Sequence, residues 1–478
     1  MLLTDRIEYS GASGDHLIHI VVTGDTSQNP AGSSFKLPLS KVVDIVPYAT
    51  GGTYNSITGD ITFTNSTGGT FVVSGITTSG GFSYWTSGST WNGTNYPIKA
   101  NNDSGLDATG DYSVAEGNNT TATGYASHAE GSNSISIGFS SHAEGGNTTA
   151  CGDSSHAEGG NTRAIGDSSH AEGYSTTTSG CSSHAEGYNT TAIGSYGTHA
   201  EGHNTTAIGS YGTHAEGLGT TAIGNSSHAE GYGTTSIGIN SHVEGVDSVS
   251  IGENSHAEGS NTTACGINSH SEGNNTTSVG VSSHSEGSYT LSYGTASHAE
   301  GGGTVSCGDF SHVEGYCTTA YGSSSHSEGY FTMAYGNISH TEGECTMACG
   351  CASHVEGQFS SAIGDFSHAE GWVSKAYGWA SHTQNDNTVA CGDASHAEGS
   401  ETTAIGNLSH AEGGDTTAIG DNSHVEGQFT TGCGYASHAE GFGSLAYGCA
   451  SHAEGNYTKS CGQFSHSEGM TVLSYSYC

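Results

Sequence analysis

The chain has 478 residues, of which 77 are glycine and only 11% are charged. Seven basic residues against 46 acidic ones give a formal charge of −39, which repels phosphate backbones and anionic lipids. We therefore expect no binding to nucleic acid and no association with a membrane. No run approaches the roughly 18 apolar residues of a membrane-spanning helix, and the first residues lack the basic and apolar regions of a signal peptide.

Residues 1–105 are predicted to form a small β-rich domain that ends in a linker. All four prolines of the chain lie in this part. Residues 61–64 and 70–73 are short β-rich runs, and the Asn-Ser-Thr-Gly-Gly segment between them is typical of a hairpin. Residues 101–105, Asn-Asn-Asp-Ser-Gly, are predicted to be the linker.

Residues 106–478 are predicted to form a shaft of repeats. The repeat has 14 residues and the form Ser-His-Ala-Glu-Gly-x-x-Thr-Thr-Ala-Ile-Gly-x-x, and the chain contains 26 copies. Two copies carry one extra residue, at Tyr196-Gly197 and at Tyr211-Gly212. Each copy buries little surface alone and depends on its neighbours. A repeat of this period predicts an all-β, parallel β-solenoid.

Each repeat divides into two halves, and each half is a five-residue strand followed by a two-residue corner. The third strand position is always small, so these side chains should point together into a flattened coil. Glycine closes nearly every strand, and we expect it to supply the positive φ of a tight corner. Representative corner glycines are Gly145, Gly152, Gly259 and Gly266. An interior filled with alanine buries little apolar surface, which predicts oligomerisation.

Histidine and glutamate recur on one face of the first strand. Histidine takes the second position in 25 of 26 copies, and glutamate takes the fourth in 25, with Gln384 as the one replacement. Residues two apart on a strand point to the same face. The predicted structural ladder is represented by His128, His142, His156, His256, His396, Glu130, Glu144, Glu158, Glu258 and Glu398.

Four interpretations of this ladder are open. It could line a trimer interface, where paired charges fix register, or the Ile, Tyr and Cys positions of the second strand could do so instead. Imidazole with carboxylate also suits divalent metals, and it suits general-base catalysis. Because 25 identical positions single out no pocket, we expect no catalytic residue, no metal site and no cofactor. If His and Glu pair, the pKa of the imidazoles should be raised and that of the carboxylates lowered.

Thirteen cysteines are present, and seven of them share the fourth position of the second strand. Most of those seven are two or more coils apart, which exceeds the reach of a disulfide. We predict free thiols that act as small apolar fillers.

Successive strands that end in Ala-x-Gly, two in each 14-residue coil, resemble the head repeats of YadA-like trimeric autotransporter adhesins. The first copy, residues 113–117, reads Ser-Val-Ala-Glu-Gly and is intermediate between the Ser-Val-Ala-Ile-Gly strand of that family and the Ser-His-Ala-Glu-Gly strand of this chain. The resemblance covers about three-quarters of the chain and implies a left-handed parallel β-roll in a homotrimer. The His-containing repeats, and the N-terminal segments 51–54 and 68–71, resemble those of bacteriophage and other viral tail-fibre proteins.

The expected function is that of a structural fibre and not of an enzyme. We expect residues 1–105 to attach to a virion or tail component, while the shaft projects outward. Its C-terminal end is expected to meet a host surface receptor or a tip protein. The signal peptide, coiled-coil stalk and membrane barrel of the adhesins are not visible, which favours a virion or extracellular location. The alternative is a cell-surface trimeric adhesin or extracellular filament subunit exported by an unrecognised route.

Overall fold

The computed structural model describes residues 17–22, 33–38, 49–55, 60–65, 70–73, 85–87, 98–100 and 107–475. The predicted linker, residues 101–105, lies outside these ranges. No helix in the described part of the chain is long and apolar enough to cross a membrane.

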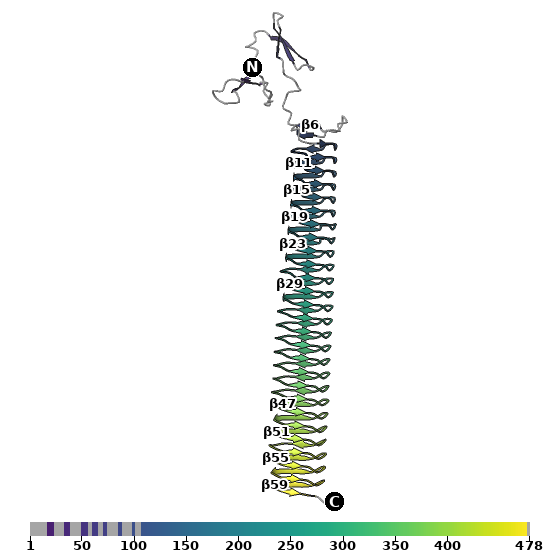
Figure 1. The fold of residues 1–478 in the computed structure, drawn as a ribbon, viewed down its shortest axis with the longest axis vertical. Coiled ribbons are helices and arrows are strands. Elements are labelled where there is room, and N and C mark those ends of the chain that lie inside the picture. The colour runs from purple at the N-terminus through teal and green to yellow at the C-terminus, as the bar shows by residue number, and fades with distance from the viewer. Residues whose placement is uncertain are drawn as a thin grey trace. The chain divides into compact units, whose positions relative to one another are not determined.

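The chain consists of two compact units (Figure 1). One comprises Met1–Thr86 and Ala100–Asn102, and the other comprises Ser87–Lys99 and Asp103–Cys478. The second unit contains the solenoid.

The first unit contains two antiparallel sheets among its described residues. β1 (Leu17–Val22) pairs with β2 (Ser33–Pro38). β3 (Ala49–Asn55), β4 (Asp60–Asn65) and β5 (Thr70–Val73) form the second sheet in that order. In the β4–β5 pair, residue 61 lies opposite residue 73 and residue 64 opposite residue 70, so the predicted hairpin is confirmed.

The solenoid is a stack of two-stranded coils, and equivalent strands of successive coils pair in parallel. The first strands form one sheet, which we call the His/Glu sheet, and the second strands form the other, which we call the Ile sheet. Paired residues are one repeat apart, as in His128 opposite His142 and Thr121 opposite Ile135. The predicted all-β parallel solenoid of 14-residue coils is therefore confirmed.

Strands of the His/Glu sheet begin at the second position of each repeat. The five-residue strands are β11 (His128–Ser132), β13 (His142–Gly146), β15 (His156–Gly160), β17 (His170–Tyr174), β19 (His184–Tyr188), β21 (His199–His203), β23 (His214–Leu218), β25 (His228–Tyr232), β29 (His256–Ser260), β31 (His270–Asn274), β47 (His382–Asp386), β49 (His396–Ser400), β51 (His410–Gly414), β55 (His438–Phe442), β57 (His452–Asn456) and β59 (His466–Met470). The two-residue strands are β9 (Val114–Ala115), β27 (His242–Val243), β33 (His284–Ser285), β35 (His298–Ala299), β37 (His312–Val313), β39 (His326–Ser327), β41 (His340–Thr341), β43 (His354–Val355), β45 (His368–Ala369) and β53 (His424–Val425).

Strands of the Ile sheet cover two residues each, from β8 (Asp107–Ala108) to β60 (Leu473–Ser474). Two further strands precede the repeats, β6 (Trp85–Ser87) and β7 (Ile98–Ala100). β7 pairs in parallel with β9, so the His/Glu sheet begins before residue 106.

The core runs along the inside of the coils and is made of small side chains. Ala143 and Ala150, at the third positions of the two strands, are fully buried, and equivalent alanines are fully buried along the solenoid. The first positions, occupied by Ser or Thr, are also buried. One coil shows local compensation. A side chain on Gly432 would collide with Cγ2 of Val425. The larger side chain of Val425 therefore faces a residue that has no side chain. The narrow interior predicted from the sequence is present.

The corner glycines of both sheets lie close to the backbone of the next coil, and those of the His/Glu sheet also have a left-handed φ. Gly145 and Gly259, which close strands of the His/Glu sheet, have φ of 111° and 109°, in the region that favours glycine. Gly152 and Gly266, in the Ile sheet, do not have a left-handed φ. A Cβ on Gly266 would overlap the carbonyl oxygen of Gly280 in the next coil. A Cβ on Gly259 would likewise overlap the carbonyl oxygen of Gly273, so close stacking of the coils excludes a side chain in both sheets.

The left-handed turn of each corner usually falls two residues before the next strand begins. Asn147 has φ of 58° and Ser154 has φ of 55°, and the same position is left-handed at most corners. Asn tolerates this conformation best among non-glycine residues. The expectation that the strand-closing glycine supplies the positive φ is therefore correct for one sheet only.

Candidate functional site: the His/Glu face

The histidines form one continuous stack along the outer face of the His/Glu sheet. From His128 to His466, rings of successive coils lie 4.7–4.9 Å apart between centroids. Most pairs are nearly parallel, such as His256 on His270 at 3°. The spacing is set by the strand pairing, because each histidine lies directly opposite its equivalent in the next coil.

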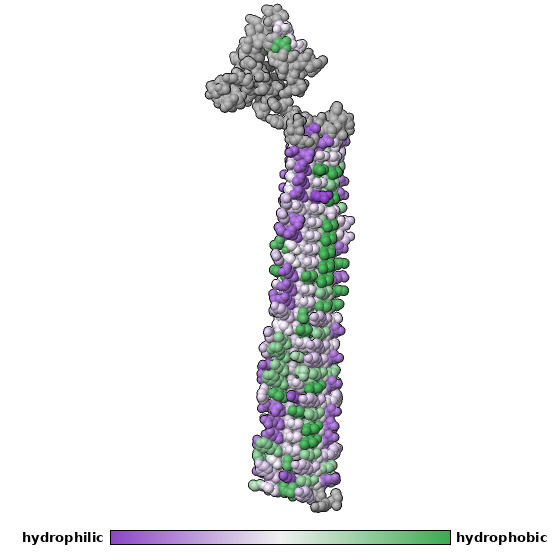
Figure 2. Space-filling model, viewed as in Figure 1, coloured by the Kyte–Doolittle hydropathy of each residue, from purple (hydrophilic) through white to green (hydrophobic). Residues whose placement is uncertain are grey.

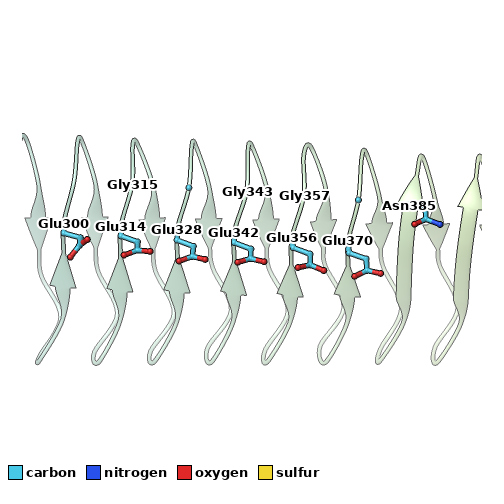
Figure 3. A pocket seen from close by; sticks show the side chains of 12 residues that line it. Glu300, Glu314, Gly315, Glu328, Glu342, Gly343, Glu356, Gly357, Glu370 and Asn385 are labelled. Atoms are coloured by element: carbon cyan, nitrogen blue, oxygen red, sulfur yellow. The ribbon is translucent and has the colours of Figure 1, made fainter.

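The glutamates form a second column beside the stack. Glu144 lies opposite Glu158 in the strand pairing, and the same register holds along the sheet. Between residues 300 and 385 the column borders a groove of about 720 Å³ (Figure 3). Its lining alternates glutamates with the glycines that follow them: Glu300, Glu314, Gly315, Glu328, Gly329, Glu342, Gly343, Glu356, Gly357, Glu370, Gly371 and Asn385.

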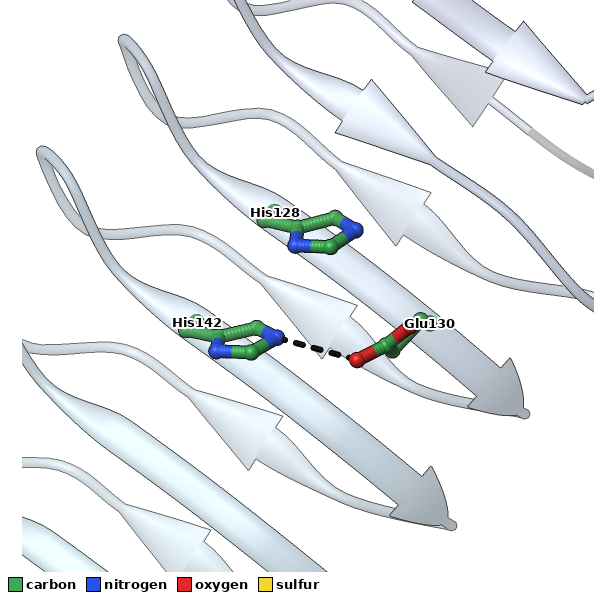
Figure 4. Close-up of side chains that lie close together, drawn as sticks. All are labelled: His128, Glu130 and His142. Carbon is green, nitrogen blue, oxygen red and sulfur yellow. Dashed lines mark ion pairs between the residues drawn. The ribbon is translucent and has the colours of Figure 1, made fainter.

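Most of the stacked histidines lie within 4.0 Å of a carboxylate of their own coil or of the preceding one. Within one coil, Nε2 of His396 is 3.2 Å from Oε2 of Glu398, and Nε2 of His256 is 3.7 Å from Oε2 of Glu258. Between coils, Nε2 of His142 is 3.4 Å from Oε1 of Glu130 (Figure 4). Most same-coil distances exceed the length of a hydrogen bond. The sequence-predicted ladder residues are thus brought together, mostly as loose pairs.

Burial and ring stacking act against protonation of the imidazoles. Burial lowers the pKa of His256, and the neighbouring His270 lowers it further, while Glu258 opposes both. The pKa of His382 falls to about 4, again chiefly through burial and then through adjacent histidines. The expectation of raised imidazole pKa values is wrong for these residues, because desolvation outweighs the nearby carboxylates.

Adjacent carboxylates shift one another's pKa in parts of the column. Hydrogen bonding to Glu258 and Glu286 raises the pKa of Glu272 to about 7. The partners move the other way, since the pKa of Glu258 and that of Glu286 are lowered by the hydrogen bond from Glu272. Like charges at coil spacing therefore avoid full ionisation near neutral pH.

The opposite sheet carries an apolar column, which we call the Ile column. It consists of the fourth position of each second strand. Ile137 is 47% exposed, and Ile251 is 43% exposed. Figure 2 shows apolar side chains in a band along the solenoid. The seven cysteines of this position are free thiols, as predicted, and they lie on this outer face, half-buried or exposed.

A second set of corner residues was not found from the sequence. Oδ1 of Asp153 accepts the backbone N–H of Phe139 at 2.8 Å, and Oδ1 of Asp167 accepts that of Asp153 at 2.9 Å. These bonds connect corners of successive coils. The available signal was the recurrence of Asp or Asn directly after the second Gly of the repeat.

Several groups in the ladder have the composition of a metal site. The ligand atoms of His128, Glu130 and His142 all lie within 4.8 Å of one another, and similar triads recur along the sheet. Imidazole nitrogen and carboxylate oxygen are ligands for divalent transition metals.

Comparison with known families gives one match. The model of the YadA head domain repeat (2 copies) matches residues 115–141, 185–211, 215–241, 244–269, 384–409, 397–423 and 411–431, all within the solenoid. No curated protein matches the chain.

Proposed function

We propose that this chain, which carries YadA head domain repeats on a parallel β-solenoid, is a structural fibre protein that works as an extracellular homotrimer. The observation that carries the proposal is the Ile column. Monomeric proteins rarely expose a contiguous apolar surface of such length. A coil filled with alanine also gains little from its own core, so burial of the column would add stability that the single chain lacks.

The composition of the Ile column suits contact between copies of the same chain. From Ile137 to Tyr475 it contains Ile, Val, Tyr and Cys, with Ser179 as the one other residue. It contains no charge, whereas the His/Glu sheet carries a carboxylate in nearly every coil. Near a threefold axis each residue approaches its own copies, so a Glu column there would place three carboxylates in each layer. We therefore place the Ile sheet at the trimer axis.

The three basic residues of the Ile sheet do not interrupt this column. Arg163, Lys375 and Lys459 take the second position of their strands, beside the Ile column. Their long side chains can lay apolar stems along the interface and keep the charge in water.

Charge reversal in the column tests the trimer. We expect the wild-type chain to sediment at three times its chain mass. Replacing Ile223, Ile237 and Ile251 together by Arg should yield monomers. The matched control places Arg at three neighbouring corner positions, Ile239, Glu253 and Ile267, and should remain trimeric. A monomeric wild type, or a column variant that stays trimeric, contradicts the proposed interface.

We propose more specifically that this fibre protein is a virion or phage tail fibre. In it, residues 1–105 attach to the particle, and the shaft projects to the host surface and turns over no substrate. Its support is the resemblance of the N-terminal segments and the His-containing repeats to those of tail-fibre proteins. The alternative, a cell-surface adhesin, is favoured by the match to the YadA head repeat.

Electron microscopy separates the two. Antibodies raised against the shaft should label projections on virus particles if the fibre is viral. Labelling confined to the surface of cells would instead support the adhesin.

A further inference from the structure

Most coils of the His/Glu sheet place one imidazole nitrogen beside one carboxylate oxygen of the same coil. The distance from Nε2 to Oε2 is 3.2 Å for His396 and Glu398, and 3.4 Å for His438 and Glu440. A zinc-like ion holds both ligand types at about 2.0–2.2 Å. Two such ligands on one tetrahedral ion are about 3.4 Å apart. The same-coil pairs range from 3.2 to 4.0 Å, so they lie at this separation or slightly above it.

The imidazole nitrogens have unused binding capacity. Nε2 of His256 and Nε2 of His410 are shielded from solvent and have no hydrogen-bond partner. Their nearest carboxylate oxygens, on Glu258 and Glu412, are each 3.7 Å away. A shielded polar atom without a partner is unusual in a folded protein, and a bound ion is one of its explanations. The same condition recurs along the column, so it belongs to the repeat and not to one coil.

An ion would belong to a single coil. Two ligands of one zinc-like ion can be at most about 4.2 Å apart. The parallel rings of His256 and His270 are 4.8 Å apart between centroids, so they cannot share an ion while stacked. A carboxylate of the preceding coil can add a third ligand, as at His452, whose Nε2 is 3.8 Å from Glu440 and 3.7 Å from Glu454.

We propose that the His/Glu face binds divalent transition-metal cations of the zinc class, each held by the His–Glu pair of one coil, in a row along the solenoid. This replaces the expectation of no metal site, because each coil forms its own pair and no distinguished position is needed. Ions in neighbouring coils repel one another, so fewer ions than pairs should bind. Magnesium and calcium prefer oxygen ligands and should compete poorly. Each pair lies within one chain, so binding does not depend on the trimer.

The chain contains a natural control for this proposal. Gln384 stands where other coils have Glu, directly opposite Glu398 in the sheet. His382 therefore lacks the carboxylate of its own coil and has only Glu370 of the preceding coil, at 4.0 Å, while His396 has Glu398 of its own coil at 3.2 Å. Exchanging the two residues, with Gln384→Glu and Glu398→Gln, should move a binding site by one coil. Both side chains occur naturally at this position, so the variants should fold.

The experiment follows hydrogen–deuterium exchange at the imidazole Cε1–H by mass spectrometry, residue by residue, in the full chain. This exchange requires a protonated ring, which a bound metal excludes. Adding Zn²⁺ to the wild type should slow exchange at His396 and leave His382 little changed. Gln384→Glu should gain slowing at His382, and Glu398→Gln should lose it at His396. His203, an exposed residue at the end of β21 that stacks on Tyr188 and lies outside the histidine stack, should not respond.

Three results would overturn the proposal. One is no effect of Zn²⁺ on any stacked histidine. Another is equal slowing at His382 and His396 that ignores both substitutions. The third is equal slowing by Mg²⁺, which would show that the face only gathers counterions.

Discussion

The pKa values of single carboxyl groups in the glutamate column of the His/Glu sheet are set mainly by the adjacent carboxylates of that column. Glu272, Glu328 and Glu370 have pKa values raised to about 7, 7 and 6, in each case chiefly by hydrogen bonding to adjacent carboxylates. A raised folded-state pKa gives a contribution to stability that is present below the unfolded value, 4.5, and is lost as the pH rises through the folded value. The imidazoles act in the opposite sense. Their lowered pKa values reduce stability as the pH falls below about 6.5.

Replacing Glu272 by Gln should make the contribution of this side chain to the stability of the fold independent of pH. The amide N–H can donate to the carboxylates of Glu258 and Glu286 as the protonated acid does, and it cannot ionise. With a chelator present, the variant should melt at a higher temperature than the wild type above pH 7, and the difference should vanish towards pH 5. Melting curves across this range check it. A difference that does not change with pH would show that Glu272 holds no shared proton.

At the scale of the strand and its corner, glycine serves two purposes that look alike in the sequence. In both sheets it allows close stacking of the coils, and in the His/Glu sheet it also adopts a left-handed φ. Both appear as a Gly every seven residues. The difference arises because the two corners leave their strands at different backbone angles, which residue type does not record.

Gly266 and Gly146 provide a matched pair for the stacking explanation. Neither has a left-handed φ. An added Cβ on Gly266 overlaps the backbone of Gly280, whereas nothing lies within 4 Å of one on Gly146. Gly266→Ala should lower the free energy of unfolding by about 1–3 kcal/mol per chain, and Gly146→Ala should leave it nearly unchanged. Denaturant unfolding measures both. Equal losses would mean that backbone entropy, and not the close approach, decides the effect.

The sequence predicts the coil well because the determinants of the coil are local. A seven-residue recurrence of Gly and a small third position define strands, corners and a narrow interior without reference to other chains. The hairpin at residues 61–73 was found for the same reason. The direction of the imidazole pKa shift was predicted wrongly, because it depends chiefly on burial of the rings and then on the neighbouring histidines of adjacent coils. The participation of β7 was also missed, since Ile98-Lys99-Ala100 lacks the repeat pattern.

At the scale of the whole molecule, the solenoid has two sheets with the same interior and different exteriors. Removing 14 residues removes one complete coil and keeps every later strand in its sheet. Removing seven places every later first strand in the other sheet. The alanine interior accepts either arrangement, but the Ile column and the His/Glu column then change sides at the deletion.

Deleting residues 256–269 should therefore shorten the trimer by one coil, about 4.8 Å, and leave it intact. Deleting residues 256–262 should retain β structure by circular dichroism and lose the trimer, because the Ile column no longer continues along one face. Sedimentation compares the assemblies. If the seven-residue deletion also forms stable trimers, contact between chains does not distinguish the two sheets.

Two coils contain 15 residues instead of 14, and they show how the corners of the shaft tolerate an inserted residue. The extra residue is taken up in the corners at Tyr196-Gly197 and Tyr211-Gly212, where both glycines have left-handed φ. His184 still lies opposite His199, and the strands beyond keep their pairing. Foreign loops inserted at these corners should be displayed from a rigid support at intervals fixed by the coil, which makes the shaft a natural scaffold for arraying peptides along a line.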